Sequence, residues 1–273
     1  MICLDLFSAV LLGVIQGLTE FLPVSSSGHL VLFSSLLDVR EPSVVFEVLV
    51  HVGTLAAVLV VFWNEFVQIV QGFFHLLRRP TQAAQLYRTD IGSRLFIWLC
   101  AGTLPIVIAA LLFKDYVEQL FNSARFVGFA LIITGLILFI ADRFSGSSRS
   151  REQTLLDSLW IGIGQAVAVL PGISRSGTTI AFGLARGLSR EQAARFSFLL
   201  SIPGILGALV LSIPDLVGGT VSTSGGVLFA GMLAAAVTGY AAIRLLLQVV
   251  RRGRLVWFSY YTWIVGLLVL ILS

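Results

Sequence analysis

Two short polar stretches, set in otherwise apolar sequence, follow one pattern and limit how this chain can fold. The first is GVIQGLTEFLPVSSSGHL at residues 13–30, and the second is GIGQAVAVLPGISRSGTT at residues 162–179. Four residue pairs match at an offset of 149: Gln16 and Gln165, Ser25 and Ser174, Ser27 and Ser176, and Gly28 and Gly177. Each copy has an apolar helical pattern, a Leu-Pro break, a serine-rich turn, a glycine and a second apolar pattern. This order predicts a helix–loop–helix hairpin that occurs twice.

The residues around these stretches are too apolar for a water-soluble domain. Apolar side chains make up 57% of the chain and charged side chains 12%, whereas a typical soluble domain has about 25% charged residues. Segments of about 20 apolar residues can cross the hydrocarbon core of a bilayer. The chain contains six such segments: 44–63, 94–113, 124–141, 192–212, 226–249 and 257–272. We therefore predict an all-α polytopic membrane protein with six transmembrane helices, in preference to a soluble protein with a large helical core.

The two repeated stretches are a different kind of membrane element. Each apolar arm is too short to cross the bilayer, and Pro and Gly interrupt the middle of each copy. Irregular backbone at membrane depth is stable only where protein covers it or where it lines a water-filled cavity. We therefore predict re-entrant helix hairpins at 6–37 and 155–185, and the alternative for each is a kinked spanning helix.

The distribution of basic residues sets the orientation of these elements. If the hairpins return to their side of entry and the spans cross, the opposite faces receive very different numbers of basic residues. One face receives thirteen arginines: Arg78, Arg79, Arg88, Arg94, Arg143, Arg149, Arg151, Arg186, Arg190, Arg195, Arg251, Arg252 and Arg254. The other face receives Arg40, Lys114 and Arg125. Cytoplasmic loops are rich in Lys and Arg, so the first face is predicted to be cytoplasmic. The segment 64–93 is expected on the same face, as a surface loop with some helix.

This orientation gives the two hairpins opposite directions of entry. The first hairpin enters from the outer face and the second from the inner face, which defines an inverted-topology repeat. We expect a single membrane domain, 1–273, with repeat one at 1–113 and repeat two at 155–249. Inverted repeats place a shared site near the middle of the membrane, where the interrupted helices meet.

The tip of the first hairpin carries an unusual set of polar residues. Gln16 and Glu20 are four residues apart and share one helix face. An ionisable side chain inside a membrane segment is a candidate functional group, although Glu20 can also be a structural partner of an arginine. Ser26 and its two neighbouring serines precede a helix, where serine is also a common N-cap. His29 follows Ser26 by one helical turn, so it can deprotonate a serine or protonate a leaving oxygen.

The tip of the second hairpin combines one arginine with several hydroxyl groups. The sequence is Ser174-Arg175-Ser176-Gly177-Thr178-Thr179, and it opens the following helix. The planar guanidinium of Arg175 matches the geometry of phosphate oxygens. The first N–H groups of a helix also attract anions. These residues predict a phosphate site close to the serines of the first hairpin. Arg175 can also be the counter-ion of Glu20, and this role is compatible with the predicted phosphate site.

Other features of the chain exclude several functions. The basic residues are scattered over several loops instead of forming one patch, so no nucleic-acid partner is expected. Cys3 and Cys100 fit neither a zinc pattern nor a disulfide framework. The expected partners are the bilayer and a lipid substrate, and the oligomeric state is left open, with a homodimer as one candidate.

The motifs GLTEFLPVSSSGH and PGISRSGTT resemble the two signatures of the undecaprenyl-diphosphate phosphatase family, the bacitracin-resistance BacA/UppP proteins. The resemblance extends over essentially the whole chain and includes the segment FEVLVHVGTLAAV. It implies hydrolysis of undecaprenyl diphosphate, a long-chain polyprenyl diphosphate lipid, to undecaprenyl phosphate and inorganic phosphate. This reaction recycles the lipid carrier of cell-wall synthesis. The resemblance further implies a divalent cation, Mg²⁺ or Ca²⁺, and a multi-pass protein of the bacterial cytoplasmic (inner) membrane whose active site opens to the outer face.

The same resemblance implies roles for individual residues. The catalytic set is Glu20, Ser26, His29 and Arg175. The phosphate-binding set is Ser25, Ser27, Ser174, Ser176, Thr178 and Thr179. Glu20 is the main metal ligand, with Gln16 and Glu47 as further candidates. Many members have Glu where this chain has Gln16, so one anionic metal ligand is missing here.

Two other functions are compatible with parts of the pattern. Inverted repeats with interrupted helices are also typical of secondary transporters and lipid flippases, so transport of a phosphorylated polyprenyl lipid is the alternative. The acid-phosphatase-like lipid phosphatases share a PSGH motif that SSSGH resembles. Those enzymes also need a His and an Asp after the arginine. No His follows residue 75 in this chain, so we reject that class.

Overall fold

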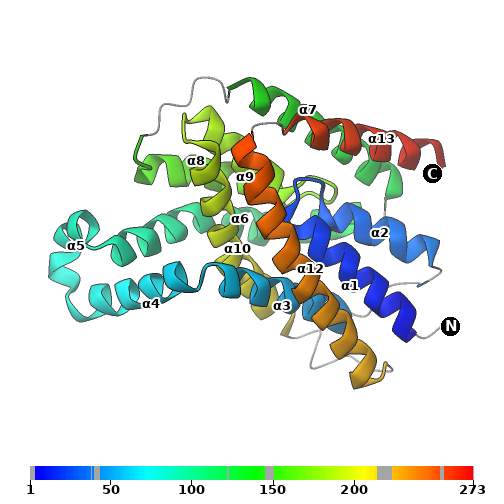
Figure 1. Ribbon diagram of the computed structural model, residues 1–273, viewed down its shortest axis with the longest axis horizontal. Coiled ribbons are helices and arrows are strands. Elements are labelled where there is room, and N and C mark those ends of the chain that lie inside the picture. The colour runs from blue at the N-terminus through cyan, green and yellow to red at the C-terminus, as the bar shows by residue number, and fades with distance from the viewer. Residues whose placement is uncertain are drawn as a thin grey trace.

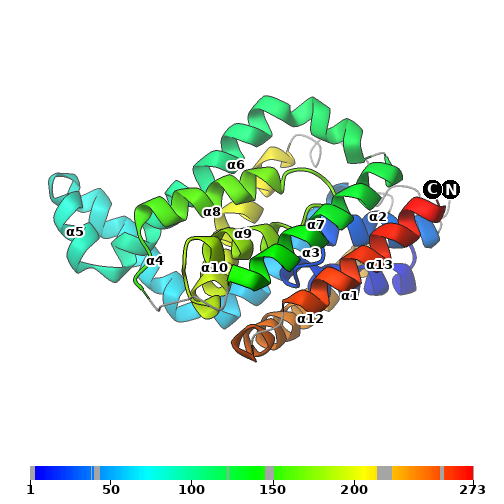
Figure 2. The ribbon, with the colours of Figure 1, turned by 90° about the horizontal axis from the view of Figure 1, so that it is seen from above.

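The computed structural model describes residues 4–37, 39, 44–121, 123–144, 151–213, 223–252 and 255–272, and contains no strand in this part of the chain. The all-α prediction is therefore confirmed for the described residues. Three of the arginine and lysine positions used to predict the orientation, Arg40, Arg149 and Arg254, lie outside them. Figures 1 and 2 show long helices crossing at steep angles around shorter central ones.

The helices follow the same order in the two halves of the chain, with two short helices before two long ones. The first half contains α1 (Leu6–Phe21), α2 (Ser26–Leu36), α3 (Val44–Val61) and α6 (Ile91–Phe121). The second half contains α8 (Leu155–Val167), α9 (Arg175–Ala185), α10 (Arg190–Leu211) and α12 (Gly225–Arg252). Two further helices, α7 (Ala124–Phe144) and α13 (Val256–Leu272), lie side by side in both views (Figures 1 and 2).

Five helices in the described residues are long and apolar enough to cross a membrane. Their apolar spans are 44–61, 91–113, 124–143, 190–211 and 225–250. Large apolar side chains on these spans face outward, as a lipid environment requires: Val60, Leu111, Leu112, Val210 and Val237. The protein is therefore an integral membrane protein.

The sixth predicted span corresponds to α13, which is apolar but has only 17 residues. At 1.5 Å per residue this helix is about 26 Å long, a few ångströms short of a hydrocarbon core of about 30 Å. The structure therefore supports five spans by length and composition, and leaves the role of α13 to be proposed below.

Each repeated stretch forms two short helices joined by a tight turn. Helices α1 and α2 have 16 and 11 residues, and α8 and α9 have 13 and 11. None is long enough to cross a bilayer alone. The second helix of each pair begins at a capping serine, because Ser25 Oγ accepts from Gly28 N at 3.4 Å and Ser174 Oγ accepts from Gly177 N at 3.1 Å. The predicted helix–loop–helix form of both stretches is therefore present.

The first helix of each hairpin packs against a long helix of the other half of the chain. Helix α1 lies alongside α12 in Figure 1, and α8 lies beside α6, as Figure 2 shows. Glycines make both contacts close. A Cβ atom on Gly13 would collide with the carbonyl of Gly231, and a Cβ atom on Gly162 would collide with the carbonyl of Gly102. Because Gly13 and Gly162 match at the same offset of 149, the two contacts are equivalent by sequence.

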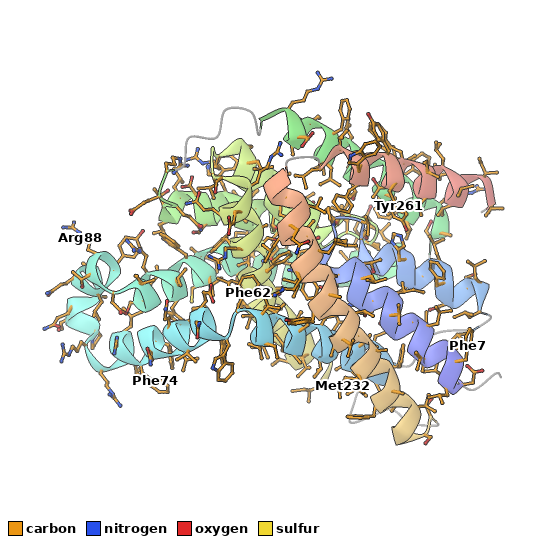
Figure 3. All side chains as sticks on the ribbon, viewed as in Figure 1. Phe7, Phe62, Phe74, Arg88, Met232 and Tyr261 are labelled. Carbon is orange, nitrogen blue, oxygen red and sulfur yellow. The ribbon has the colours of Figure 1, made fainter. Side chains whose placement is uncertain are left out.

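The segment predicted as a surface loop with some helix, 64–93, is mostly helical. Helix α4 (Trp63–Arg78), a short 3₁₀ turn (Pro80–Gln82) and α5 (Ala83–Thr89) form an arm that projects from one end of the molecule, with Arg88 at its far end (Figures 1 and 3). Asp90 then caps α6, since Ser93 N donates to its carboxylate at 2.8 Å. Hydrogen bonds from Ser93 hold the pKa of Asp90 below its usual range.

The buried carboxylate of Asp157 links the two ends of the second hairpin, on the side opposite its tip. Arg151 donates to both oxygens of Asp157 at 2.8 and 2.7 Å, and Arg186 Nε donates to one of them at 2.8 Å. Burial would raise the pKa of Asp157, but the hydrogen bonds from Arg151, Thr154 and Arg186 outweigh it and lower that pKa well below its usual range. This network joins the start of α8 to the end of α9. Asp157 corresponds by offset to Ser8 of the first hairpin, which cannot form such a network.

Candidate active site

The tips of the two hairpins meet through one buried ion pair. Glu20 lies in the last turn of α1, and Arg175 is the first residue of α9. Arg175 Nη2 donates to Glu20 Oε1 at 2.5 Å, and the two side chains are only 17% and 6% exposed. Two elements that lie 155 residues apart are therefore joined where both helices are interrupted.

The second oxygen of the Glu20 carboxylate is held from the first hairpin itself. Ser26 Oγ donates to Glu20 Oε2 at 2.6 Å, and Gln16 Nε2 donates to the same atom at 3.0 Å. The spacing of four residues puts Gln16 and Glu20 on one face of α1, while the turn after Phe21 brings Ser26 back to the carboxylate. His51 Nε2, from α3, lies 3.9 Å from Glu20 Oε2.

The turn of the first hairpin is strained at one residue. Ser25 has φ +71°, a conformation that residues other than glycine seldom adopt. Strain of this kind persists only where surrounding contacts enforce it, and it is common at functional sites. Here it allows Ser25 to cap α2 and Ser26 to turn its hydroxyl toward Glu20. Of the three serines, Ser25 therefore has the capping role expected for at least one of them.

Hydroxyl groups join the two tips directly. Ser176 Oγ donates to the carbonyl of Leu22 at 3.1 Å, and Gly172 N donates to Ser27 Oγ at 3.4 Å. Ser27 Oγ also lies 3.3 Å from Ser25 Oγ. These bonds pair backbone groups in the irregular turns, which water would otherwise have to satisfy. Ser27 and Ser176 therefore hold the two tips together.

Two predicted phosphate-binding hydroxyls are bonded elsewhere. Thr178 Oγ1 donates to the carbonyl of Ser174 at 2.7 Å, inside α9. Thr179 Oγ1 bonds the carbonyl of Arg175 and lies 2.7 Å from Ser197 Oγ of α10. Both threonines are buried. Their hydroxyls tie α9 to its own backbone and to α10 rather than facing the ion pair.

His29 lies in the same hairpin but faces away from Ser26. Its Nδ1 is 2.8 Å from the carbonyl of Ser25, and its Nε2 is 2.8 Å from the hydroxyl of Tyr261. The ring stacks on Tyr261 with 5.6 Å between centroids, and the residue is 2% exposed. Tyr261 comes from α13, on the side of that helix nearer α2 (Figure 3). Both nitrogens of His29 are therefore occupied, and neither bonds Ser26 in this structure.

Three residues of the site were not identified from the sequence. His51 stands beside Glu20, Tyr261 holds His29, and the carbonyl of Ser197 accepts from Arg175 Nη1 at 3.5 Å. Only His51 carried a usable signal, because it is an ionisable residue in an apolar span. A tyrosine near a helix end and a backbone carbonyl have no sequence signature.

A cavity of about 180 Å³ lies between α3 and α10, with His51 in its wall. Val48, Ile205 and Leu209 give it apolar walls, and Glu47 and His51 are its ionisable groups. His51 therefore stands between this cavity and the carboxylate of Glu20, which lies 3.9 Å from its Nε2. Glu47, predicted as a further acidic group, therefore lines the approach to the site and does not bond Glu20.

The residues at the tips do not form a resident metal site. Mg²⁺ and Ca²⁺ bind several oxygen ligands, mainly carboxylates and carbonyls. Here Arg175, Ser26 and Gln16 donate to the carboxylate of Glu20, so both of its oxygens are engaged. Gln16 presents its NH₂ group to Glu20, and its buried Oε1 has no hydrogen-bond partner among the described residues. Within those residues no three His, Cys, Asp or Glu side chains come together.

The fold and the site define a class of protein. It is an integral membrane protein with two interrupted helix hairpins, whose tips bring a carboxylate, a serine hydroxyl and an arginine together below a cavity between two helices. Such a cluster can bind a phosphate group and transfer a proton beside it.

Comparison with known proteins identifies the family. The sequence model described as "Bacitracin resistance protein BacA" matches residues 9–268, and the chain belongs to this family. The undecaprenyl-diphosphatase of Carboxydothermus hydrogenoformans is 44% identical, over 98% of this chain and 97% of that protein. The undecaprenyl-diphosphatase of Methanosphaera stadtmanae is 40% identical, over 99% of each chain. Undecaprenyl-diphosphatase 1 of Shouchella clausii is 39% identical, over 98% of this chain and 96% of that protein.

The buried ion pair makes a prediction about stability. Removing one partner leaves an unpaired buried charge, which costs about 3–5 kcal/mol, so Arg175→Ala is expected to unfold at much lower denaturant concentration in detergent micelles. Adding Glu20→Gln to Arg175→Ala removes the unpaired charge and should restore part of that loss. The partly exposed pair Arg195–Glu65, at 3.3 Å, is the matched control. Breaking it should cost less than about 1 kcal/mol. Equal losses for the two pairs would contradict the burial of Glu20 and Arg175.

Proposed function

We propose that this protein hydrolyses undecaprenyl diphosphate to undecaprenyl phosphate and inorganic phosphate. The observation that carries the proposal is the Glu20–Arg175 pair with Ser26 bonded to the same carboxylate. Relatives that cover nearly the whole chain are named undecaprenyl-diphosphatase. A diphosphate lipid also suits a site that lies inside a membrane protein and opens through an apolar cavity.

Arg175 is proposed to bind the terminal phosphate. In the structure without substrate its guanidinium is paired with Glu20, and an entering phosphate offers two oxygens in the plane of the same fork. Helices α2 and α9 both begin at the tips, so their positive dipole ends and first N–H groups favour the same anion. Ser27, Ser174 and Ser176 surround this position and are the proposed hydroxyl ligands.

Ser26 is proposed as the nucleophile and Glu20 as its base. Ser26 Oγ attacks the terminal phosphorus while Glu20 Oε2, 2.6 Å away, takes the hydroxyl proton. The bond from that phosphorus to the bridging oxygen breaks, and undecaprenyl phosphate leaves with the electron pair. In the second step a water molecule attacks the phosphoserine, and the proton on Glu20 returns to Ser26 Oγ. Both protons of the water leave with inorganic phosphate.

The divalent cation expected from the family is proposed to enter with the diphosphate. The tips offer one carboxylate that is already bonded and one free amide oxygen, which is too few ligands for a resident Mg²⁺ or Ca²⁺. A cation bound to the diphosphate neutralises part of its charge in a site of low dielectric constant. Gln16 Oε1 is the protein atom that can contact such a complex.

His29 is proposed to position Ser26 indirectly, by fixing the turn of the first hairpin. Because its two nitrogens bond the carbonyl of Ser25 and the hydroxyl of Tyr261, it fixes the strained residue that precedes Ser26. This is a positioning role and replaces the proton transfer expected from its position one turn after Ser26.

We propose the following membrane topology. Helices α3, α6, α7, α10, α12 and α13 cross the membrane. The hairpins 6–37 and 155–185 enter from the outer and inner faces, within repeats 1–113 and 155–249. The cavity between α3 and α10 then lies toward the outer face of the bacterial cytoplasmic membrane, because it is formed by the start of α3 and the end of α10.

This topology is testable with an impermeant thiol reagent in intact cells, in a background that lacks the native cysteines. A cysteine at Ser224, just before α12, should react because it lies on the outer side. A cysteine at Gln85, in the exposed arm, should react only after the cells are opened. The reverse pattern would invert the proposed orientation.

Transport of a polyprenyl phosphate lipid is the second candidate. The reciprocal packing of α1 on α12 and α8 on α6 favours it, because equivalent contacts on opposite sides are typical of transporters with inverted repeats. Purified protein in detergent separates the two functions, since hydrolysis continues in micelles and vectorial transport cannot.

The proposed function predicts phosphate release from a long-chain prenyl diphosphate by the purified protein in detergent. After substrate labelled in its terminal phosphate is mixed and quenched, the label should be found on Ser26, and Ser26→Ala should abolish both label and turnover. Arg175→Lys keeps the charge but loses the planar fork, so its kcat/KM should fall by on the order of 10²-fold or more. Turnover without a labelled serine would mean that water attacks the diphosphate directly. No phosphate release from wild-type protein would refute the function.

A further inference from the structure

We propose that His51, together with Glu20, holds the water molecule that completes the hydrolysis. His51 lies in α3, outside both hairpins, and its Nε2 is 3.9 Å from Glu20 Oε2. The inference rests on the proposed function and adds a residue to its second step. The histidine of the hairpin motif, His29, is not available for this task.

The hydrogen bond of the other ring nitrogen sets the chemistry of His51 Nε2. Nδ1 of His51 lies 2.7 Å from the backbone carbonyl of Glu47. A carbonyl oxygen can only accept a hydrogen bond, so Nδ1 carries the proton. In the neutral ring, Nε2 is then an acceptor with its lone pair free. The backbone of α3 therefore orients the imidazole with its acceptor toward Glu20.

The distance between Nε2 and Glu20 suits a bridging water. A separation of 3.9 Å is too long for a direct hydrogen bond, but one water molecule fits between the two groups. It donates to Nε2 and lies against the Glu20 carboxyl, which carries the Ser26 proton in the second step. A water in this position lies next to Ser26 Oγ, which bonds the same carboxylate oxygen at 2.6 Å. It is therefore beside the phosphorus that a phosphorylated Ser26 would carry.

The two histidines differ in how accessible their side chains are to water. The side chain of His51 is 37% exposed and lines the cavity between α3 and α10. Its facing charged groups are Glu20 on α1 and Glu47 on α3 itself. His29 is 2% exposed, and both of its nitrogens already have partners. Water that enters through the cavity reaches the nitrogen of His51 and is excluded from that of His29.

A pair of amide substitutions tests the role of each ring nitrogen. The amide of Gln reaches the position of Nε2, whereas the amide of Asn reaches only that of Nδ1. His51→Asn should lower kcat by on the order of 10²-fold, the loss expected when a reactant is no longer oriented, with KM changed less than about threefold. His51→Gln should retain at least about five times the kcat of His51→Asn. His75→Asn, in the exposed arm, is the control and should keep wild-type kcat.

Restoration of kcat by added imidazole is a second test, and it does not depend on the Asn and Gln substitutions. His51→Ala enlarges the cavity, so free imidazole should enter and restore part of the lost kcat. His29→Ala should not be restored, because its site is closed. Retention of kcat by His51→Gln would not follow if His51 were only a counter-ion of Glu20, since an amide carries no charge.

The outcomes separate this inference from the proposed function. A wild-type protein that releases phosphate, with His51→Asn at normal kcat or His51→Asn and His51→Gln equally impaired, would overturn the role of His51 alone. An increase in KM at unchanged kcat would do the same, because it would make His51 a substrate-binding group. A wild-type protein that releases no phosphate would overturn both proposals.

Discussion

The buried ion pair between Glu20 and Arg175 is the interaction on which the rest of this structure depends. An isolated charge inside a membrane protein is costly, and two charges are stable there only when they pair and their other bonding positions are filled. Arg175 satisfies one oxygen of Glu20, and Ser26 and Gln16 satisfy the other. The pair requires the end of α1 and the start of α9 to lie at the same depth in the membrane, because the two side chains could not otherwise reach each other.

The two hairpins are held at that depth by different means. The first is fixed along its length, where Gly13 brings the backbone of α1 against α12. The second has the same glycine contact at Gly162, and in addition the Asp157 network at its open end. The arginine therefore comes from the hairpin that has this network, and the carboxylate and the serine come from the hairpin that lacks it.

The sequence predicted the parts of the fold that follow from repetition and apolar length. The offset of 149 located both hairpins, and five of the six apolar segments correspond to helices long enough to cross a membrane. The sixth segment corresponds to α13, which has 17 residues and is slightly shorter than a span. The arm 64–93 was predicted as a surface loop with some helix. Its helices are longer than expected, because a polar amphipathic helix and a polar loop have similar composition.

The site was predicted less completely than the fold. Glu20, Ser26 and Arg175 were identified because they are polar residues at the interruptions of apolar helices. His29 was assigned a proton-transfer role from its spacing to Ser26, but spacing does not specify which neighbour the imidazole bonds. Tyr261, 232 residues away, is that neighbour. Contacts between elements far apart in the chain depend on packing, and one sequence does not encode them as a local pattern.

The central claim, that the two interrupted tips meet, is tested most directly by a disulfide between them. A Cβ atom on Gly177 would lie 3.2 Å from Cβ of Pro23, close to the separation found in disulfides. With Cys3 and Cys100 replaced, Pro23→Cys and Gly177→Cys should cross-link on mild oxidation, and mass spectrometry should detect the joined peptide. Pro23→Cys with Gly207→Cys is the control, because nothing lies within 4 Å of a Cβ at Gly207. If Pro23→Cys and Gly177→Cys stay unlinked, or the control pair links equally well, the tips do not meet as described.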